Sequence, residues 1–209
     1  MLRNIIFAAL LATGLSACAQ QTISLPKPDM NRQTLTVMNS FKERHSERQY
    51  STRMLSDQDL SDLLWAAQGK NREDGRLTAA TARNMQEIRT YVFTEKGVCY
   101  YDPQNHTLTK VADGDHRDIV AGRQEFAKAA PVSLVLVADM EKFGSDSQHA
   151  VWMVGVDVGI VCENINLFCS AAGLNTVPRG TMDQKAIQTL LGLTEKQVPV
   201  INNPVGYRE

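Results

Sequence analysis

The sequence predicts a single α+β domain. Three observations favour this fold class: one long stretch with almost no charge, one amphipathic helix, and several short β-branched segments separated by turn residues. The chain has 209 residues, of which 43% are apolar and 22% are charged, as in an ordinary globular domain. Its formal net charge of −1 leaves no basic excess for neutralising phosphates, so we expect no nucleic-acid partner.

The long uncharged stretch covers residues 150–180 and contains only Asp157, Glu163 and Arg179 as charged residues. Its apolar positions fit both the two-residue period of a strand and the three-to-four-residue period of a helix. Length favours the helix, because strands seldom exceed about ten residues. We expect a helix of about six turns that ends at Gly173. Since it is apolar nearly all round, it should lie in a core or at a subunit interface.

The other elements follow from local patterns. The pattern predicts helices at 35–41, 115–129 and 183–192, and a further one that Ser56 caps and Gly69 ends. It predicts strands at 88–94, 98–101, 108–111 and 198–202, with residues 205–208 closing the chain. The segment 130–138 is continuous and β-branched, so we place it centrally in the sheet.

The N-terminus resembles that of an exported lipoprotein. Arg3 is followed by an apolar run, 5–15, that is too short to span a bilayer, as in a signal peptide. The sequence Leu15-Ser16-Ala17-Cys18 resembles the bacterial lipobox, in which cleavage precedes the cysteine and its thiol is lipidated. The alternative is a plain signal peptide with a chance cysteine. We expect residues 1–18 to be a lipoprotein signal peptide with Cys18 lipidated. The domain would then be anchored at the bacterial cell envelope, facing the periplasm or cell exterior.

Residues 19–34 are polar and contain two prolines, which predicts an extended tether between membrane and domain. The remaining cysteines are Cys99, Cys162 and Cys169, and an odd number leaves at least one free thiol in an exported protein. We expect the last two, on the long helix, to be small core residues. No His/Cys cluster is present in the sequence, and we predict no metal site.

A group of phosphate-binding residue types follows the first expected helix: Arg44, His45, Ser46 and Arg48. Arginine bonds phosphate in a bidentate manner and serine donates a hydroxyl. A solvated, charged helix end explains the same residues, and local evidence alone favours that explanation.

The wider pattern resembles the nitroreductase family of flavin enzymes. The resemblance rests on R-[RH]-S-x-R at the end of the first helix followed by Tyr50, on the later pair Asn84 and Gln86, and on three features of the 150–180 stretch. These features are the D-x-G pair Asp157 and Gly159, the run Glu163-Asn164-Ile165-Asn166-Leu167, and the turn Pro178-Arg179-Gly180. In place of the proline and serine that the family has before Asn84, this chain has Ala80 and Thr81.

The resemblance implies a nitroreductase-like domain over 35–209 that binds FMN. It implies a mainly antiparallel sheet flanked by helices, and a homodimer formed through the long helix with two FMN molecules at the interface. Its implied contacts to FMN are Arg44, His45, Ser46, Arg48 and Arg208 at the phosphate and ribityl chain, Asn84 and Gln86 at the ring or ribityl hydroxyls, and Pro178, Arg179 and Gly180 beside the reactive edge.

The implied activity is an FMN-dependent oxidoreductase that transfers electrons or hydride through flavin N5 to or from a nitro compound, quinone or similar small molecule in ping-pong turnover. The cofactor carries the chemistry, and no side chain suggests itself as acid or base. A backbone N–H near Arg179 and Gly180 would donate to N5. The donor would be NAD(P)H or, because an exported protein does not meet that cytoplasmic reductant, an unidentified periplasmic donor. The alternative is a lipid-anchored flavin-binding or assembly protein with the same fold and little or no turnover.

Overall fold

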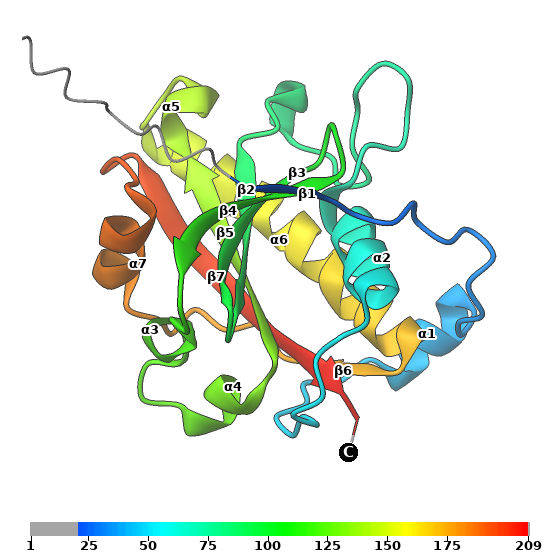
Figure 1. Cartoon of the computed structure of the whole chain (residues 1–209). Coiled ribbons are helices and arrows are strands. Elements are labelled where there is room, and N and C mark those ends of the chain that lie inside the picture. Colours follow the sequence, from blue (N-terminus) through cyan, green and yellow to red (C-terminus); the bar gives the residue numbers. More distant parts are fainter. Residues whose placement is uncertain (1–20, 209) are drawn as a thin grey trace, which may run out of the picture.

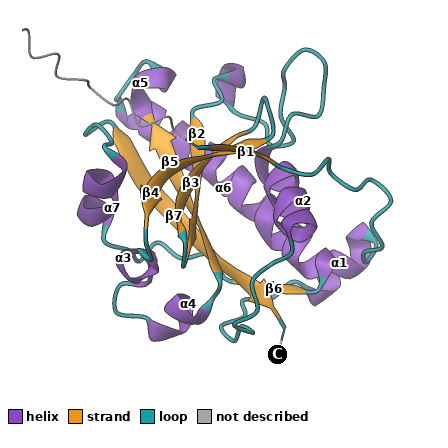
Figure 2. Ribbon diagram, in the orientation of Figure 1, coloured by secondary structure: helices purple, strands orange, loops and turns teal. Residues whose placement is uncertain are grey.

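The structure, a computed structural model, describes residues 21–208. The predicted signal peptide and Cys18 lie outside the described residues. The predicted α+β fold is confirmed: a seven-stranded sheet has the order β1-β4-β3-β2-β5-β7-β6 (Figures 1 and 2). Every neighbouring pair of strands is antiparallel. The strands are β1 (Thr22–Ser24), β2 (Ile88–Thr94), β3 (Gly97–Asp102), β4 (Thr107–Asp113), β5 (Val132–Asp139), β6 (Leu174–Thr176) and β7 (Gln197–Tyr207).

Helices cover both faces of this sheet (Figure 1). One face carries α1 (Val37–Glu43), α2 (Asp57–Gln68) and α6 (Gln148–Ala172), and the other carries α3 (Arg117–Ala121), α4 (Glu125–Ala129) and α7 (Gln184–Leu191). The short helix α5 (Met140–Phe143) follows β5 directly, and a 3-10 turn, η1 (Ala82–Asn84), precedes β2.

Strand β5 lies between β2 and β7 and is buried along its whole length, as its sequence predicts. Leu134 and Leu136 pack with α2 and α6, whereas Val135 and Val137 pack on the face of α7. This alternation follows from the two-residue period of a strand and divides the core into two layers.

The long uncharged stretch forms the predicted helix, α6, of 25 residues. Ser147 caps its start, and Gly173 ends it in the left-handed conformation (φ 74°) that favours glycine. By length and composition α6 could cross a membrane, but Val158 and Ile165 are fully buried against the sheet side of the domain. The helix is therefore a core helix of the folded domain.

One face of α6 is exposed, so it is not buried all round within a single chain. Trp152 is 63% exposed and Val156 is 43% exposed. Gly155 and Gly159 lie on the same face, and a Cβ added at either would meet nothing within 4 Å. We call these residues the α6 stripe: Trp152, Gly155, Val156 and Gly159. It is an apolar surface with room for close approach of another backbone.

Two expectations about elements are wrong. Residues 115–129 do not form one helix, because Gly122 (φ 59°) ends α3 and a new helix, α4, begins after Gln124. Residues 22–32 do not form a free tether, because β1 pairs with β4, and Arg32 forms ion pairs with Asp59 and Asp62 of α2. Sequence composition could not show this, since the partners of the segment are distant in the chain.

Candidate functional site

The segment after α1 is held along β6 and β7. The Glu47 N–H donates to the Thr176 carbonyl at 2.9 Å, and the Asn175 side-chain amide donates to the Gln49 carbonyl at 2.8 Å. The helix ends at Arg44, whose backbone is extended (φ −62°, ψ 118°). Arg44, His45, Ser46 and Arg48 are therefore presented on the surface beside the C-terminal ends of α6 and β7.

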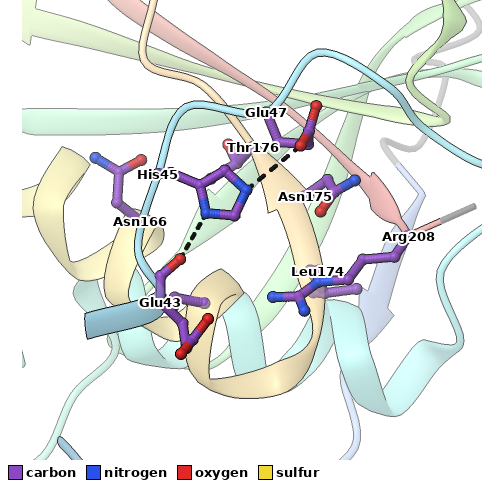
Figure 3. Close-up of a pocket in the computed structure, with 9 residues that line it drawn as sticks. Glu43, His45, Glu47, Asn166, Leu174, Asn175, Thr176 and Arg208 are labelled. Carbon is purple, nitrogen blue, oxygen red and sulfur yellow. Dashed lines mark hydrogen bonds and ion pairs between the residues drawn. The ribbon is translucent and has the colours of Figure 1, made fainter. Parts of the chain in front are cut away.

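A polar pocket lies beneath this segment (Figure 3). Its walls come from the segment after α1, from the last turns of α6, from β6 and from the end of β7. The lining residues are Glu43, His45, Glu47, Asn166, Ser170, Leu174, Asn175, Thr176 and Arg208. Two of the predicted site residues, His45 and Arg208, thus meet at one pocket although they are far apart in the sequence.

His45 is engaged within the segment rather than pointing freely into solvent. Its Nδ1 lies 2.6 Å from the Glu43 carbonyl oxygen, and its Nε2 lies 3.4 Å from the Glu47 carboxylate (Figure 3). A hydrogen bond from the Arg48 backbone N–H is the main influence that lowers the pKa of Glu47, and His45 adds to it. His45 therefore orients the loop and Glu47, and its contact with FMN stays a prediction.

Among residues 21–208, three arginines that line the pocket or lie on the segment beside it have no carboxylate partner. Among residues 21–208, the guanidinium groups of Arg44, Arg48 and Arg208 form no ion pair, and all three side chains are exposed. Free guanidinium donors match the geometry of phosphate oxygens. This donor set fits the phosphate of FMN.

Arg179 lies in the Pro178–Gly180 turn, and its side chain points into the domain. Its side chain is only 6% exposed and donates to Asn202 Oδ1 (2.8 Å), the Ala121 carbonyl (2.8 Å) and Gln124 Oε1 (2.9 Å). Burial lowers its pKa. The guanidinium therefore joins the turn to β7 and α3, and it is not directed to an external ligand.

The turn itself offers one backbone donor. The Arg179 N–H donates to the Asn202 carbonyl at 2.8 Å and is not available to flavin N5. The next residue, Gly180, is exposed, and its N–H has no acceptor among residues 21–208. Pro178 is exposed beside it. Of the two backbone N–H groups predicted to donate to flavin N5, only that of Gly180 has no acceptor among residues 21–208.

The loop that carries Asn84 and Gln86 has an unusual backbone. Arg83, Asn84 and Gln86 all have positive φ (54°, 56° and 51°), which is uncommon for residues other than glycine. The Gln86 side-chain amide donates to the Gly75 carbonyl (3.0 Å) and to Asn84 Oδ1 (3.1 Å). Gln86 therefore fixes the loop, and the exposed Asn84 is its more accessible amide.

The Asn84–Gln86 loop and the segment at 44–48 lie beside different parts of α6. The Ala82 N–H donates to Asp157 in the first half of the helix (2.8 Å), whereas Ser170 near its end donates to the Ser40 carbonyl (2.9 Å). From Asp157 to Ser170, at about 1.5 Å per residue, is about 20 Å along the helix axis. One chain thus brings the 44–48 segment and Arg208 together at the pocket, but not Asn84 and Gln86.

Sequence reasoning missed several residues of the site. Phe126 packs its ring under the guanidinium groups of both Arg48 and Arg179, at 5.8 and 5.5 Å from the ring centroid. Asn175 and Thr176 hold the 44–50 segment, and they come from a strand, β6, too short to show a period. Of the missed residues, only Asn166 could have been found from the sequence, because it lies in the Glu163–Leu167 run on which the family resemblance rests.

Comparison with known proteins agrees with this geometry. The profile of the nitroreductase family matches residues 41–207. A protein of Methanocaldococcus jannaschii, provisionally named a nitroreductase, is 28% identical over 200 residues, which is 90% of this chain and 98% of the relative. A crystal structure from Ralstonia eutropha, also provisionally described as a nitroreductase, has a TM-score of 0.83 at 30% identity and covers 97% of this chain and 96% of its own.

More distant structures share the fold. The NADPH:FMN oxidoreductase of Vibrio harveyi, solved with NAD+, has a TM-score of 0.65 at 18% identity and covers 83% of this chain and 69% of its own. The family profile and the fold support an oxidoreductase of the nitroreductase fold. The chain belongs to the nitroreductase family.

Proposed function

We propose that this protein is an FMN-dependent oxidoreductase that acts on a small organic substrate such as a nitro compound or a quinone. The observation that carries the proposal is a set of three exposed arginines without carboxylate partners among residues 21–208: Arg208, which lines the pocket at the end of α6, and Arg44 and Arg48 of the adjoining segment. When bound, FMN supplies a two-electron redox centre at N5.

The residues of the chain bind and orient the cofactor. Arg44, Arg48 and Arg208 neutralise the phosphate, and the Ser46 hydroxyl donates a further hydrogen bond. The free N–H of Gly180 donates to the edge of the ring. A glycine suits this position because a side chain there would point toward the flavin.

We propose that the working unit is a homodimer, as is common in the family. The α6 stripe is the surface that a second copy would cover. In a two-fold dimer with antiparallel α6 helices, the first half of one helix faces the second half of the other. Asn84 of the partner subunit would then lie beside the arginines of this chain, which removes the separation of about 20 Å along α6.

We also propose lipid anchoring through Cys18 at the cell envelope, with NAD(P)H or a periplasmic carrier as electron donor. The sequence around Cys18 motivates this part of the proposal. Cys18→Ser should move the protein from the membrane fraction to the soluble fraction and abolish incorporation of a labelled fatty acid. A protein that stays in the membrane fraction after this change would contradict anchoring at Cys18.

The spectrum of the purified chain from residue 19 onward tests the proposed function. We expect a yellow protein with about one flavin per chain, bleached under anaerobic conditions by NADH or NADPH. Bleaching by dithionite alone would indicate a different physiological donor. Bound flavin that passes no electrons to nitro compounds or quinones would favour the binding protein without turnover. A colourless protein whose unfolding temperature ignores added FMN would contradict the proposal.

A further inference from the structure

Glu87 is a buried carboxyl group that the proposed function does not use. It lies between the loop of Asn84 and Gln86 and the first residue of β2, and its exposure is 0%. Among residues 21–208, neither of its carboxyl oxygens has a hydrogen-bond partner. Buried polar atoms are nearly always bonded, so an unbonded carboxyl calls for a physical explanation.

The neighbouring carboxyl group is that of Asp157, in the first half of α6. Asp157 is 2% exposed, and after burial its carboxyl is the neighbouring group that most raises the pKa of Glu87. Two ionised carboxylates are both acceptors and repel each other, so they cannot satisfy one another. The contact becomes a hydrogen bond only if one of the two holds a proton.

The surroundings assign the proton to Glu87. Asp157 Oδ2 already accepts a hydrogen bond from the Ala82 N–H at 2.8 Å. Glu87 accepts no such bond. Burial, followed by the contact with Asp157, raises the pKa of Glu87 to about 7.

This pair supports a strained loop. Between Ala82 and Glu87, three residues other than glycine have positive φ: Arg83, Asn84 and Gln86. Such backbone persists only where the surroundings fix it. The fixing contacts are the Ala82 bond to Asp157, the Lys142 ammonium donating to the Gln86 carbonyl (2.7 Å), and the Asp139 N–H donating to the Glu87 carbonyl (3.0 Å).

We propose that Glu87 and Asp157 form a carboxylic acid–carboxylate pair that holds one proton and positions the Asn84–Gln86 loop for the flavin. Glu87 and Asp157 are positioning residues, because neither reaches the surface that a ligand would contact. The part of the inference that concerns the flavin rests on the proposed function, whereas the shared proton does not.

The other charged groups around the pair do not replace this proton. Lys142 of α5 is the nearby cation, and it lowers the pKa of Glu87 only as a minor influence. Arg89 of β2 is paired with Asp139 of β5. Arg83 lies over the ring of Phe143, 5.3 Å from its centroid. Loss of the proton would therefore place two negative charges in one buried contact.

Thermal unfolding between pH 6 and pH 8.5 without flavin tests the shared proton. Wild type and three variants would be compared: Glu87→Gln, Asp157→Asn, and the control Glu195→Gln at an exposed residue. The folded state binds the proton more tightly than the unfolded state, so the wild-type unfolding temperature should fall as pH rises through 7. Glu87→Gln removes the titrating group and should lose most of this slope, Asp157→Asn should lose the part that the neighbouring carboxylate causes, and the control should retain the slope. Equal slopes in all four proteins would overturn the inference.

Titration with FMN over the same pH range tests the positioning role. The wild-type dissociation constant should rise at least tenfold from pH 6 to pH 8.5, whereas that of Glu87→Gln should change less than twofold and match wild type at pH 6. If the unfolding slopes differ as expected but FMN binding depends on pH equally in both proteins, the positioning role is wrong. Failure of every protein to bind FMN contradicts the proposed function, and the unfolding slopes still decide whether the proton is shared. If Glu87→Gln does not fold, Asp157→Asn decides the same question.

Discussion

Arg48 and Arg179 lie against the same aromatic ring, that of Phe126, with their guanidinium carbons 5.8 and 5.5 Å from its centroid. The two guanidinium groups differ in their burial and in their hydrogen bonds. Arg179 is buried and hydrogen-bonded to four different acceptors, whereas Arg48 is exposed and has no carboxylate partner among residues 21–208. The ring thus orients Arg48 without occupying its N–H donors, which stay available to an anion.

Replacing this ring should weaken FMN binding without unfolding the protein. Phe126→Leu keeps apolar volume but removes a cation–π contact of about 1 kcal/mol, so the dissociation constant for FMN should rise about fivefold. Fluorescence titration would measure it. Phe126→Tyr retains an aromatic face and should bind like wild type. Equal losses in both variants would show that the ring does not act through Arg48.

Removing a phosphate-binding arginine should affect FMN and riboflavin differently. A charge-assisted hydrogen bond contributes about 1.5–3 kcal/mol, so Arg208→Gln or Arg44→Gln should raise the dissociation constant for FMN about tenfold or more. Riboflavin lacks the phosphate, and its affinity should stay the same. Arg72→Gln, at an exposed arginine of the 70–76 loop, is the control. A matching loss of riboflavin affinity would contradict a phosphate contact.

A charge on the α6 stripe should separate the subunits. Trp152→Glu places a carboxylate on a residue that is 63% exposed in the single chain, and a buried unpaired charge opposes association. We expect the mass in solution to fall from dimer to monomer by light scattering, with loss of bound flavin. Ile23→Glu, on an exposed residue of β1 outside the stripe, should remain dimeric. A dimer that survives Trp152→Glu would place the interface elsewhere.

The ion pairs of Arg32 should stabilise the fold in a pH-dependent manner. Burial raises the pKa of Asp59, but hydrogen bonds from Ser56, Tyr207 and Arg32 outweigh it and hold that pKa below its usual value of 3.8. A lowered pKa stabilises the folded state above the unfolded pKa, and this contribution is lost as pH falls through the folded pKa.

Arg32→Ala should therefore lower the free energy of unfolding by about 1 kcal/mol at pH 7, and by less below pH ~4. Urea unfolding at both pH values would measure the difference. Arg76→Ala, whose partner Asp74 is half exposed, should have almost no effect. A loss for Arg32→Ala that is the same at both pH values would show that packing, rather than charge, holds the N-terminal segment.

The length and composition of the apolar segments made most of the fold predictable. The strand at 132–139 and the helix at 148–172 are long enough for their apolar pattern to identify them, and Gly173 marks the helix end. The break at Gly122 was not predictable, because a glycine inside a helical pattern is often tolerated. The attachment of residues 22–32 depends on partners in α2 and β4 that no local pattern reveals.

Residue types and spacing indicated which residues to consider for the site, but they did not indicate how the side chains are arranged in space. Arg208 lines the pocket, whereas Arg44 and Arg48 lie on the segment whose other residues, including His45, line it. Arg179 belongs to the same turn, but its side chain points into the domain because Asn202 and the end of α3 supply its acceptors. Side-chain direction in a turn depends on such tertiary acceptors, which residue types and spacing do not specify.

The distance along α6 between Asp157 and Ser170 has a consequence for genetics. If each active centre takes its arginines from one chain and its Asn84 loop from the other, then two inactive mutants can complement each other. A chain without Arg44 and Arg208, exchanged with a chain whose 82–86 loop is altered, would form a hybrid with one intact centre and one doubly defective centre. Whether two alleles complement each other would depend on whether they affect opposite ends of this helix.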